Sequence, residues 1–172
     1  IECLPTPDHV PVDADPAWLS CAVQFHGHLG PWATAGLRAG MTARQAAEAN
    51  GYFDVRVTVE GPFVKPPQSC FLDGLQVSTG ATLGKRNLKW IKADKVVVRL
   101  ENTKTGKQVE VRPTPELMSL LTSFKPKPMP KTTQSTDDHQ VGEVQEHLLE
   151  NIARRIAKMP GEKILRVRIL AN

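Results

Sequence analysis

The sequence predicts an α+β domain built from both helices and strands. Apolar residues recur at helical spacing in some segments and alternate with polar residues in others, as in amphipathic helices and half-buried strands. The two kinds of element follow no regular βαβ period, which favours an α+β arrangement. The chain has 172 residues, 40% hydrophobic and 23% charged, so one domain with an appendage fits its length and composition. No apolar stretch approaches the roughly 18–20 residues that span a bilayer, so we expect a soluble chain without a membrane partner.

Three elements are predicted in the first fifty residues. Residues 1–15, rich in proline and acidic residues, should form an irregular arm. The following segment is predicted to be a helix, because apolar residues recur there at helical spacing. They are Trp18, Ala22, Phe25 and Leu29, with stops at Gly27 and Gly30. A second helix should begin at Pro31, since proline suits the first helical position, and should run to about Ala49, where Asn50-Gly51 ends it.

A strand, a helix and a hairpin are predicted in the middle of the chain. Valines alternate with polar residues over residues 55–59, a pattern typical of a half-buried strand. A third helix should cover residues 70–79, with Ser69 as its N-cap and Gly80 closing it. Two further strands should pair as a β-hairpin; they cover residues 96–100 and 108–111.

The C-terminal part is predicted to contain a linker between two ordered regions. A short helix within residues 113–124 should end the α+β domain, which spans residues 16–124. Residues 125–140 are rich in proline and lack hydrophobic periodicity, so they should form a linker. In residues 141–172, one helix face and a final strand are predicted to pack on the core or on a partner subunit. The helix face carries Val144, Leu148, Ile152 and Ile156, and the strand covers residues 165–169.

Positive charge concentrates between Lys85 and Lys107. This window holds eight lysine and arginine residues against two acidic ones, whereas the whole chain has a net charge of +4. A basic hairpin here could contact nucleic acid or another acidic partner. An aromatic content of 5% supplies few side chains for base stacking. A solvated sheet face is therefore the favoured interpretation, and nucleic acid is an unlikely partner.

Cysteine usage and the N-terminus bear on the compartment. The chain has three cysteines, Cys3, Cys21 and Cys70, and no CxxC motif, so a disulfide framework is not expected. A single disulfide bond is left as an alternative. The chain begins at Ile1 without a charged and apolar signal segment, which favours the cytoplasm. Export with a removed leader stays open as the alternative.

The most informative segment is His26-Gly27-His28, two imidazoles separated by one glycine at the break between two predicted helices. Glycine permits unusual backbone angles, so both rings can turn toward one point. Neutral imidazole nitrogens bind zinc, iron, nickel and copper, so this pair indicates a metal site; two polar residues capping a turn are the alternative. The positive end of the second helix should disfavour protonation of both rings. The other histidines are predicted to be surface residues; they are His9, His139 and His147.

Cys70 and Asp73 extend the candidate site. At the start of a helix the Cys70 thiolate would be stabilised by amide dipoles, so we expect a depressed pKa. Asp73 lies one turn onward, where it could orient an imidazole or bind the ion directly. A buried small cysteine and an ordinary first-turn carboxylate are the alternatives. Residues 78–87, rich in glycine, should form a structured turn lining the site, with anion binding through Lys85 or Arg86 as a lesser option.

Two long motifs resemble those of the FmdE family, which is named for one of the subunits of molybdenum or tungsten formylmethanofuran dehydrogenase. They read FHGHLGPWATAGLRAG and, about forty residues later, CFLDGLQVSTGATLGKRNL. The likeness spans roughly residues 16–112. It implies a FwdE/GAPDH-domain-like α+β fold, with helices packed on a small mixed sheet and a C-terminal helix and strand. It also implies a metal bound by the HGH histidines and motif cysteines, and a homodimer.

Carried over by position, the resemblance implies His26, His28 and Cys70 as metal ligands, with zinc foremost and iron or nickel as alternatives. Around them it implies residues near the ion or a substrate: Asp73, Gln76, Thr79, Lys85 and Asn87. Two departures from the family pattern matter, because Gly30 and Ala81 stand where the family usually has cysteine. The remaining His/His/Cys set leaves one coordination position open.

Three functions are compatible with this set. The first is a metal-binding protein accessory to a molybdenum or tungsten formylmethanofuran- or formate-type dehydrogenase, with an oxidoreductase subunit as partner. The second is a free-standing metal-dependent enzyme in which the open position carries water. The third is a binding protein for a metal-containing cofactor such as haem, with a histidine or Cys70 as axial ligand. The sequence leaves open whether the protein is catalytic.

Overall fold

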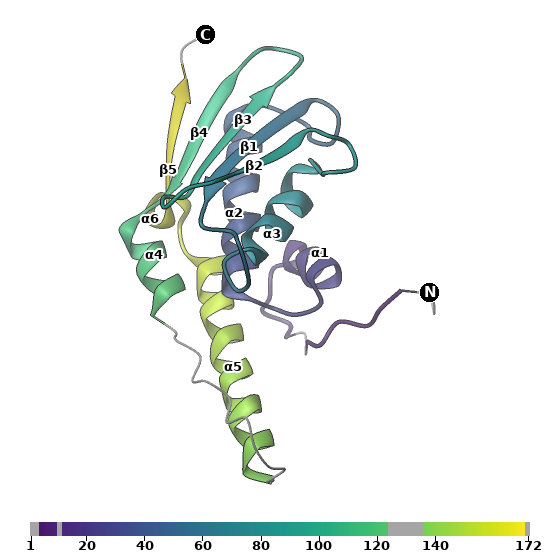
Figure 1. The fold of residues 1–172 in the computed structure, drawn as a ribbon, viewed down its shortest axis with the longest axis vertical. Helices are drawn as coiled ribbons and strands as arrows, with labels where there is room; N and C mark the ends of the chain where they lie inside the picture. Colours follow the sequence, from purple (N-terminus) through teal and green to yellow (C-terminus); the bar gives the residue numbers. More distant parts are fainter. Residues whose placement is uncertain (1–3, 10–11, 124–135, 171–172) are drawn as a thin grey trace.

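The computed structural model describes residues 4–9, 12–123 and 136–170, and for residues 136–144 only the backbone. These ranges form helices and one five-stranded sheet, which confirms the α+β class (Figure 1). The helices are α1 (Ala17–His26), α2 (Pro31–Ala46), α3 (Cys70–Thr79), α4 (Pro115–Thr122), α5 (Thr136–Lys158) and α6 (Gly161–Ile164). The strands are β1 (Val55–Gly61), β2 (Leu88–Lys92), β3 (Val97–Asn102), β4 (Gln108–Pro113) and β5 (Leu165–Leu170). Within the described ranges, no helix is both long and apolar enough to cross a bilayer.

The sheet is mixed, with strand order β2-β1-β3-β4-β5. β1 and β2 are parallel, with Val57 opposite Leu88, and the other neighbouring pairs are antiparallel. The predicted hairpin is present as β3 and β4, in which Val98 lies opposite Val111. The basic window of residues 85–107, predicted as a hairpin, is not one, because β2 and β3 flank β1 on opposite sides instead of pairing with each other.

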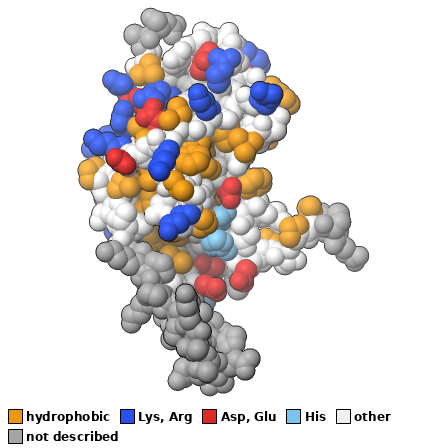
Figure 2. Space-filling view, viewed as in Figure 1, with side chains coloured by type: hydrophobic (Ala, Val, Ile, Leu, Met, Phe, Trp, Pro, Cys, Tyr) orange, Lys and Arg blue, Asp and Glu red, His pale blue; other side chains and the backbone are white. Residues whose placement is uncertain are grey.

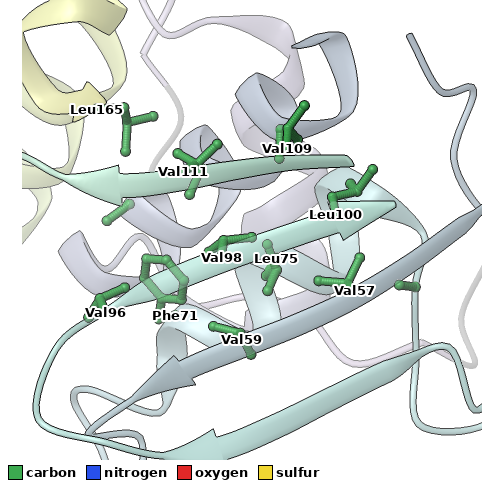
Figure 3. Packing of buried hydrophobic residues seen from close by; sticks show 14 of the residues in the cluster. Val57, Val59, Phe71, Leu75, Val96, Val98, Leu100, Val109, Val111 and Leu165 are labelled. Atoms are coloured by element: carbon green, nitrogen blue, oxygen red, sulfur yellow. The ribbon is translucent and has the colours of Figure 1, made fainter. Parts of the chain in front are cut away.

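The main core lies between one face of the sheet and helices α2 and α3. The valines of β1 alternate with partly exposed polar residues, as predicted, and lie fully buried. Figure 3 shows side chains from β1, β3 and β4 around Phe71 and Leu75 of α3. Both of these residues are completely buried; burial of one such side chain contributes about 1.5–3 kcal/mol. This packing holds α3, and with it Cys70, against the sheet.

Helices α2 and α3 approach each other closely and run in the same general direction. Contacts follow the same order along both helices, since Gly36 faces the backbone of Phe71 and Gly40 faces Ser78. Because the two helices run alongside each other, their N-terminal ends lie at the same end of the molecule. The segment between α1 and α2 lies at that end too, so the chain itself brings Gly30 and Cys70 into one region.

The helix ends differ from the predictions in detail. α2 ends at Ala46, before the predicted Ala49, and Glu48 just beyond it takes a left-handed φ of 53°. α3 covers residues 70–79 and ends at Gly80, as predicted, but the Ser69 side chain makes no cap hydrogen bond because its backbone is already helical. In α1 the predicted apolar face is wrong at Phe25, which is 56% exposed. The buried face of α1 is instead formed by Leu19, Ala22 and Val23.

The long helix α5 begins earlier than predicted. Residues 136–140, predicted as part of the linker, are helical, whereas residues 125–135 of the same segment lie outside the described ranges. The C-terminal turns of α5 pack on α2, with Ala153 and Ile156 fully buried. Leu148, on the predicted apolar face, is 47% exposed, so that face is buried only toward the end of the helix. In Figure 1, α5 extends well beyond the rest of the fold.

Candidate functional site

His26 and His28 lie side by side at the junction of α1 and α2. His26 is the last residue of α1, and Gly27 ends that helix in a left-handed conformation with φ of 96°. This backbone conformation favours glycine and turns the chain so that the two imidazole rings approach each other. Their ring centroids are 4.5 Å apart, and the ring planes are inclined by 43°. The structure therefore confirms that both imidazoles share one location.

Asp73 orients the His26 ring. Nδ1 of His26 lies 2.7 Å from Oδ2 of Asp73, the contact that the sequence suggested for this carboxylate. A carboxylate can only accept, so Nδ1 of His26 donates this hydrogen bond. The His26 side chain is 9% exposed, and its buried Nε2 has no hydrogen-bond partner among the described residues. A buried polar atom without a partner costs free energy.

His28 lies nearer the surface, and its surroundings favour the neutral form. Its pKa is lowered by the protein packed around the ring and, secondarily, by the neighbouring His26. The sequence predicted the same direction but attributed it to the end of α2. Nearby, a methyl group built on Gly30 would lie 3.0 Å from Nε2 of His28 and 3.9 Å from Nε2 of His26. Both Nε2 atoms therefore border the space left by the missing side chain of Gly30.

Cys70 reaches the same region from the start of α3. It lines a cavity of about 300 Å³ together with His28 and Gly30. The prediction of a depressed thiol pKa is wrong, because burial and the nearby carboxylate of Asp73 raise the pKa of Cys70. Desolvation and a like charge outweigh the helix amides here, so Cys70 is a neutral thiol.

This cavity is largely apolar and is closed by helices that are distant in sequence. Its wall comes from the α2 start, the loop before α3, and helices α4 and α5. The apolar members are Pro31, Trp32, Pro66, Pro67, Leu120, Leu121, Leu149 and Ile152, and Gln145 completes the wall. Sequence reasoning did not identify the role of Trp32, although it follows the HGH motif closely. Below we call this space the Trp32 cavity.

A second, more polar cavity of about 680 Å³ lies on the other side of His28. The polar side chains that line it with His28 are Asp8, His9, Glu146, His147 and Glu150. The prediction that His9 is a surface residue is wrong, because its side chain is 8% exposed and its Nδ1 lies 3.0 Å from Glu150. The N-terminal arm thus docks on α5, where Arg154 also binds Asp15. Figure 2 shows histidine and acidic side chains together on this face, below a more basic region.

The motif residues that follow Cys70 along α3 lie farther from the imidazoles. Gln76 is half-buried, six residues along α3. Thr79 ends that helix, about 14 Å along its axis from Cys70, and its hydroxyl donates to the carbonyl of Leu75. Asn87 holds the following turn through bonds to backbone groups, and Nζ of Lys85 lies 5.9 Å from the ring centroid of Phe53. The predicted turn is present, but at the opposite end of α3 from Cys70.

The structure does not gather a complete metal-ligand cluster. In the part of the chain that it describes, no three His, Cys, Asp or Glu side chains are arranged so that they could hold an ion. Cys70 and the exposed Cys21 are both free, and Cys3 lies outside the described residues. The structure does contain the pair of imidazoles, with His26 hydrogen-bonded to Asp73.

Comparisons with known proteins place these features in context. A family model described as "FmdE, Molybdenum formylmethanofuran dehydrogenase operon" matches residues 25–166. A "Probable S-adenosyl-L-methionine-binding protein" of Archaeoglobus fulgidus is 31% identical over 96 residues, which cover 52% of this chain. The match spans only 25% of that relative's length. The family match therefore covers both the imidazole pair and Cys70.

Proposed function

This chain belongs to the FmdE family, and from that membership we propose that it is a metal-binding protein accessory to a molybdenum or tungsten formylmethanofuran- or formate-type dehydrogenase. The family description supports the dehydrogenase context. A dehydrogenase subunit and a second copy of this chain are the proposed partners, and the cytoplasm is the proposed location. The proposal assigns no catalytic residue.

The buried Nε2 of His26 is the observation that carries the metal proposal. Histidines that bind metals commonly donate their other ring N–H to a carboxylate, which fixes the tautomer and strengthens the ligand. His26 has this arrangement with Asp73, while its Nε2 has no partner among the described residues. A divalent ion at Nε2 would satisfy this atom, and His28 lies close enough to contribute a second neutral imidazole.

Cys70 is the proposed third ligand. Cys70 lines the Trp32 cavity together with His28, and this shared location supports its assignment. The raised thiol pKa means that the ion must displace a proton from sulfur, which makes binding weaker at low pH. Histidine and thiolate ligands suit zinc, with iron and nickel as alternatives. A bound ion would supply a Lewis-acidic centre with an open position.

Metal titration of a double variant tests this proposal. Wild-type protein should bind one zinc ion per chain, and His26→Ala/His28→Ala should lose at least about 100-fold in affinity, because both imidazoles are removed. Zinc affinity is measured by competition with a chromophoric chelator, and circular dichroism checks the fold. Cys21→Ala, which removes an exposed thiol of α1, is the matched control and should bind zinc as the wild type does. Unchanged stoichiometry and affinity in the double variant would refute the proposed site.

A further inference from the structure

The Trp32 cavity has properties that the metal proposal does not use. No acidic, lysine or arginine side chain is present among the described residues that line it. An ion placed there without a partner would pay a large desolvation cost. A volume of about 300 Å³ lies at the lower end of the range for small-molecule pockets. The wall therefore favours a compact, uncharged and mainly apolar occupant.

Trp32 supplies a second, independent observation. The residue is 4% exposed, and its indole Nε1 is buried without a hydrogen-bond partner among the described residues. The indole ring is held in place by Phe63, with which it makes an edge-to-face contact with centroids 6.5 Å apart. Indole N–H groups are donors only, and buried ones usually find an acceptor. Trp32 lines the cavity, but its Nε1 is covered, so a ligand oxygen would reach this donor when the side chains over it move aside.

We propose that the Trp32 cavity binds a small uncharged organic molecule, whose apolar body fills the cavity and whose carbonyl oxygen accepts a hydrogen bond from Nε1 of Trp32. The apolar part contacts residues from three separate elements, including Leu121 of α4 and Leu149 of α5. His28 and Cys70 share the same wall, so the bound molecule lies next to the proposed metal ligands. The site itself does not require the metal.

Three probes of similar shape test which chemistry the cavity selects. Acetophenone carries an aromatic ring and a carbonyl, ethylbenzene lacks the acceptor, and benzoate carries a charge. Each is titrated into the full chain in the presence of a metal chelator, and the ¹H–¹⁵N signals of the indole groups are recorded. Acetophenone should shift the Trp32 signal saturably, and should bind about fivefold more tightly than ethylbenzene. Benzoate should bind at least about tenfold more weakly than acetophenone, because its charge is buried without a partner.

Variants then locate the site. Trp32→Phe keeps an aromatic ring but removes the donor, so it should weaken acetophenone binding and leave ethylbenzene binding unchanged. Leu149→Trp should fill the cavity and weaken both ligands by at least about tenfold. Leu148→Trp on the same helix is the matched control, because Leu148 is exposed and does not line the cavity.

The outcomes separate this proposal from the metal proposal. The absence of a saturable shift at Trp32, benzoate binding as tight as that of acetophenone, or unchanged binding in Leu149→Trp would each overturn the cavity proposal. The comparison among probes in the wild-type protein holds even where a variant fails to fold. If the wild-type protein does not bind zinc, only the proposed function is contradicted. The probe titrations contain a metal chelator, so their outcome does not depend on bound metal.

Discussion

Gly30 decides how much space the imidazole pair has. Its α-carbon faces both Nε2 atoms, and any side chain there would enter the space between them. A β-carbon there would lie 3.0 Å from Nε2 of His28 and 3.9 Å from Nε2 of His26. The absence of a side chain at Gly30 thus leaves open space beside both Nε2 atoms.

Adding a side chain at Gly30 gives a prediction at the residue scale. Gly30→Cys places a sulfur next to both Nε2 atoms and should raise zinc affinity by at least about tenfold, since thiolate is a strong zinc ligand. Gly30→Ala is the matched control, because it adds the same β-carbon without sulfur and should lower affinity through contact with His28. Competition titration measures both variants. Equal affinities for the cysteine and alanine variants would contradict the proposed ligand geometry.

The individual site residues were predictable to different degrees. The HGH spacing indicated the imidazole pair. For Asp73 the sequence left two roles open, orienting an imidazole or binding the ion, and the structure shows the contact with His26. The protonation of Cys70 was not predictable, because the sequence shows its helix position but not the burial that raises its pKa. The unpartnered Nε1 of Trp32 was not predictable either, because its burial depends on how the neighbouring elements pack around the ring.

At the scale of elements, the α2–α3 contact depends on small residues. Helix α3 approaches so closely that a β-carbon on Gly74 would collide with the carbonyl oxygen of Ala33 and lie 2.5 Å from the backbone nitrogen of Leu37. Backbone atoms cannot move aside as flexible side chains do. The glycines therefore set the distance between the helices that carry Cys70 and Gly30.

Gly74→Ala should destabilise the protein by about 3 kcal/mol, the upper end of typical overpacking costs, because the helices must separate. Gly161→Ala at the start of α6 is the matched control, since a β-carbon there meets only Arg38 at 3.8 Å. The control should be neutral or stabilising by up to about 1 kcal/mol, because alanine reduces the freedom of the unfolded chain. Urea unfolding measures both. Similar losses in the two variants would contradict a special role for the α2–α3 contact.

Most elements were predictable from local patterns, and the exceptions have physical causes. β1, α3 and the β3–β4 hairpin follow from alternation, helical spacing and turn residues. β2 was not predicted from periodicity, because its charged sequence carries little alternation and its only strand partner is β1. The early start of α5 at Thr136 lies in a segment whose prolines and polar residues gave no helical signal.

At the scale of the whole molecule, charge is organised on the sheet face away from α2 and α3. Glu110 of β4 is 3% exposed and binds three arginines from three strands. They are Arg99, Arg112 and Arg168. The hydrogen bond from Arg112, followed by the charges of all three, holds the pKa of Glu110 below its usual value. This carboxylate ties β5 to the rest of the sheet.

Glu110→Gln should therefore lower stability in a pH-dependent way. Because the pKa of Glu110 is lower in the folded than in the unfolded protein, its charge stabilises the fold at pH values above the unfolded-state pKa. This contribution is lost as the pH falls through the folded-state pKa. At pH 7 the variant should lose about 1–2 kcal/mol, less than a fully buried pair, because the arginines are partly exposed. The loss should shrink at pH 3, as measured by urea unfolding at both values.

Glu101→Gln is the control for this experiment, because Glu101 pairs only with the well-exposed Arg56 in the described contacts. Its effect should be at most about 1 kcal/mol at neutral pH. A stability difference for Glu110→Gln that stays constant from pH 7 to pH 3 would contradict the charge explanation and indicate a packing effect instead.

The sequence by itself determined the class of fold, the order of most elements, the family and the pair of imidazoles at one turn. These features depend on periodicity, on turn residues and on motifs confined to short stretches of chain, so local sequence is enough to predict them. Only the tertiary structure decided the protonation of Cys70, the separation of the glycine-rich turn from the imidazoles, and the cavity around Trp32. Each of these depends on desolvation and distance between elements far apart in the chain, such as α2 and α5, and folding alone brings such elements together.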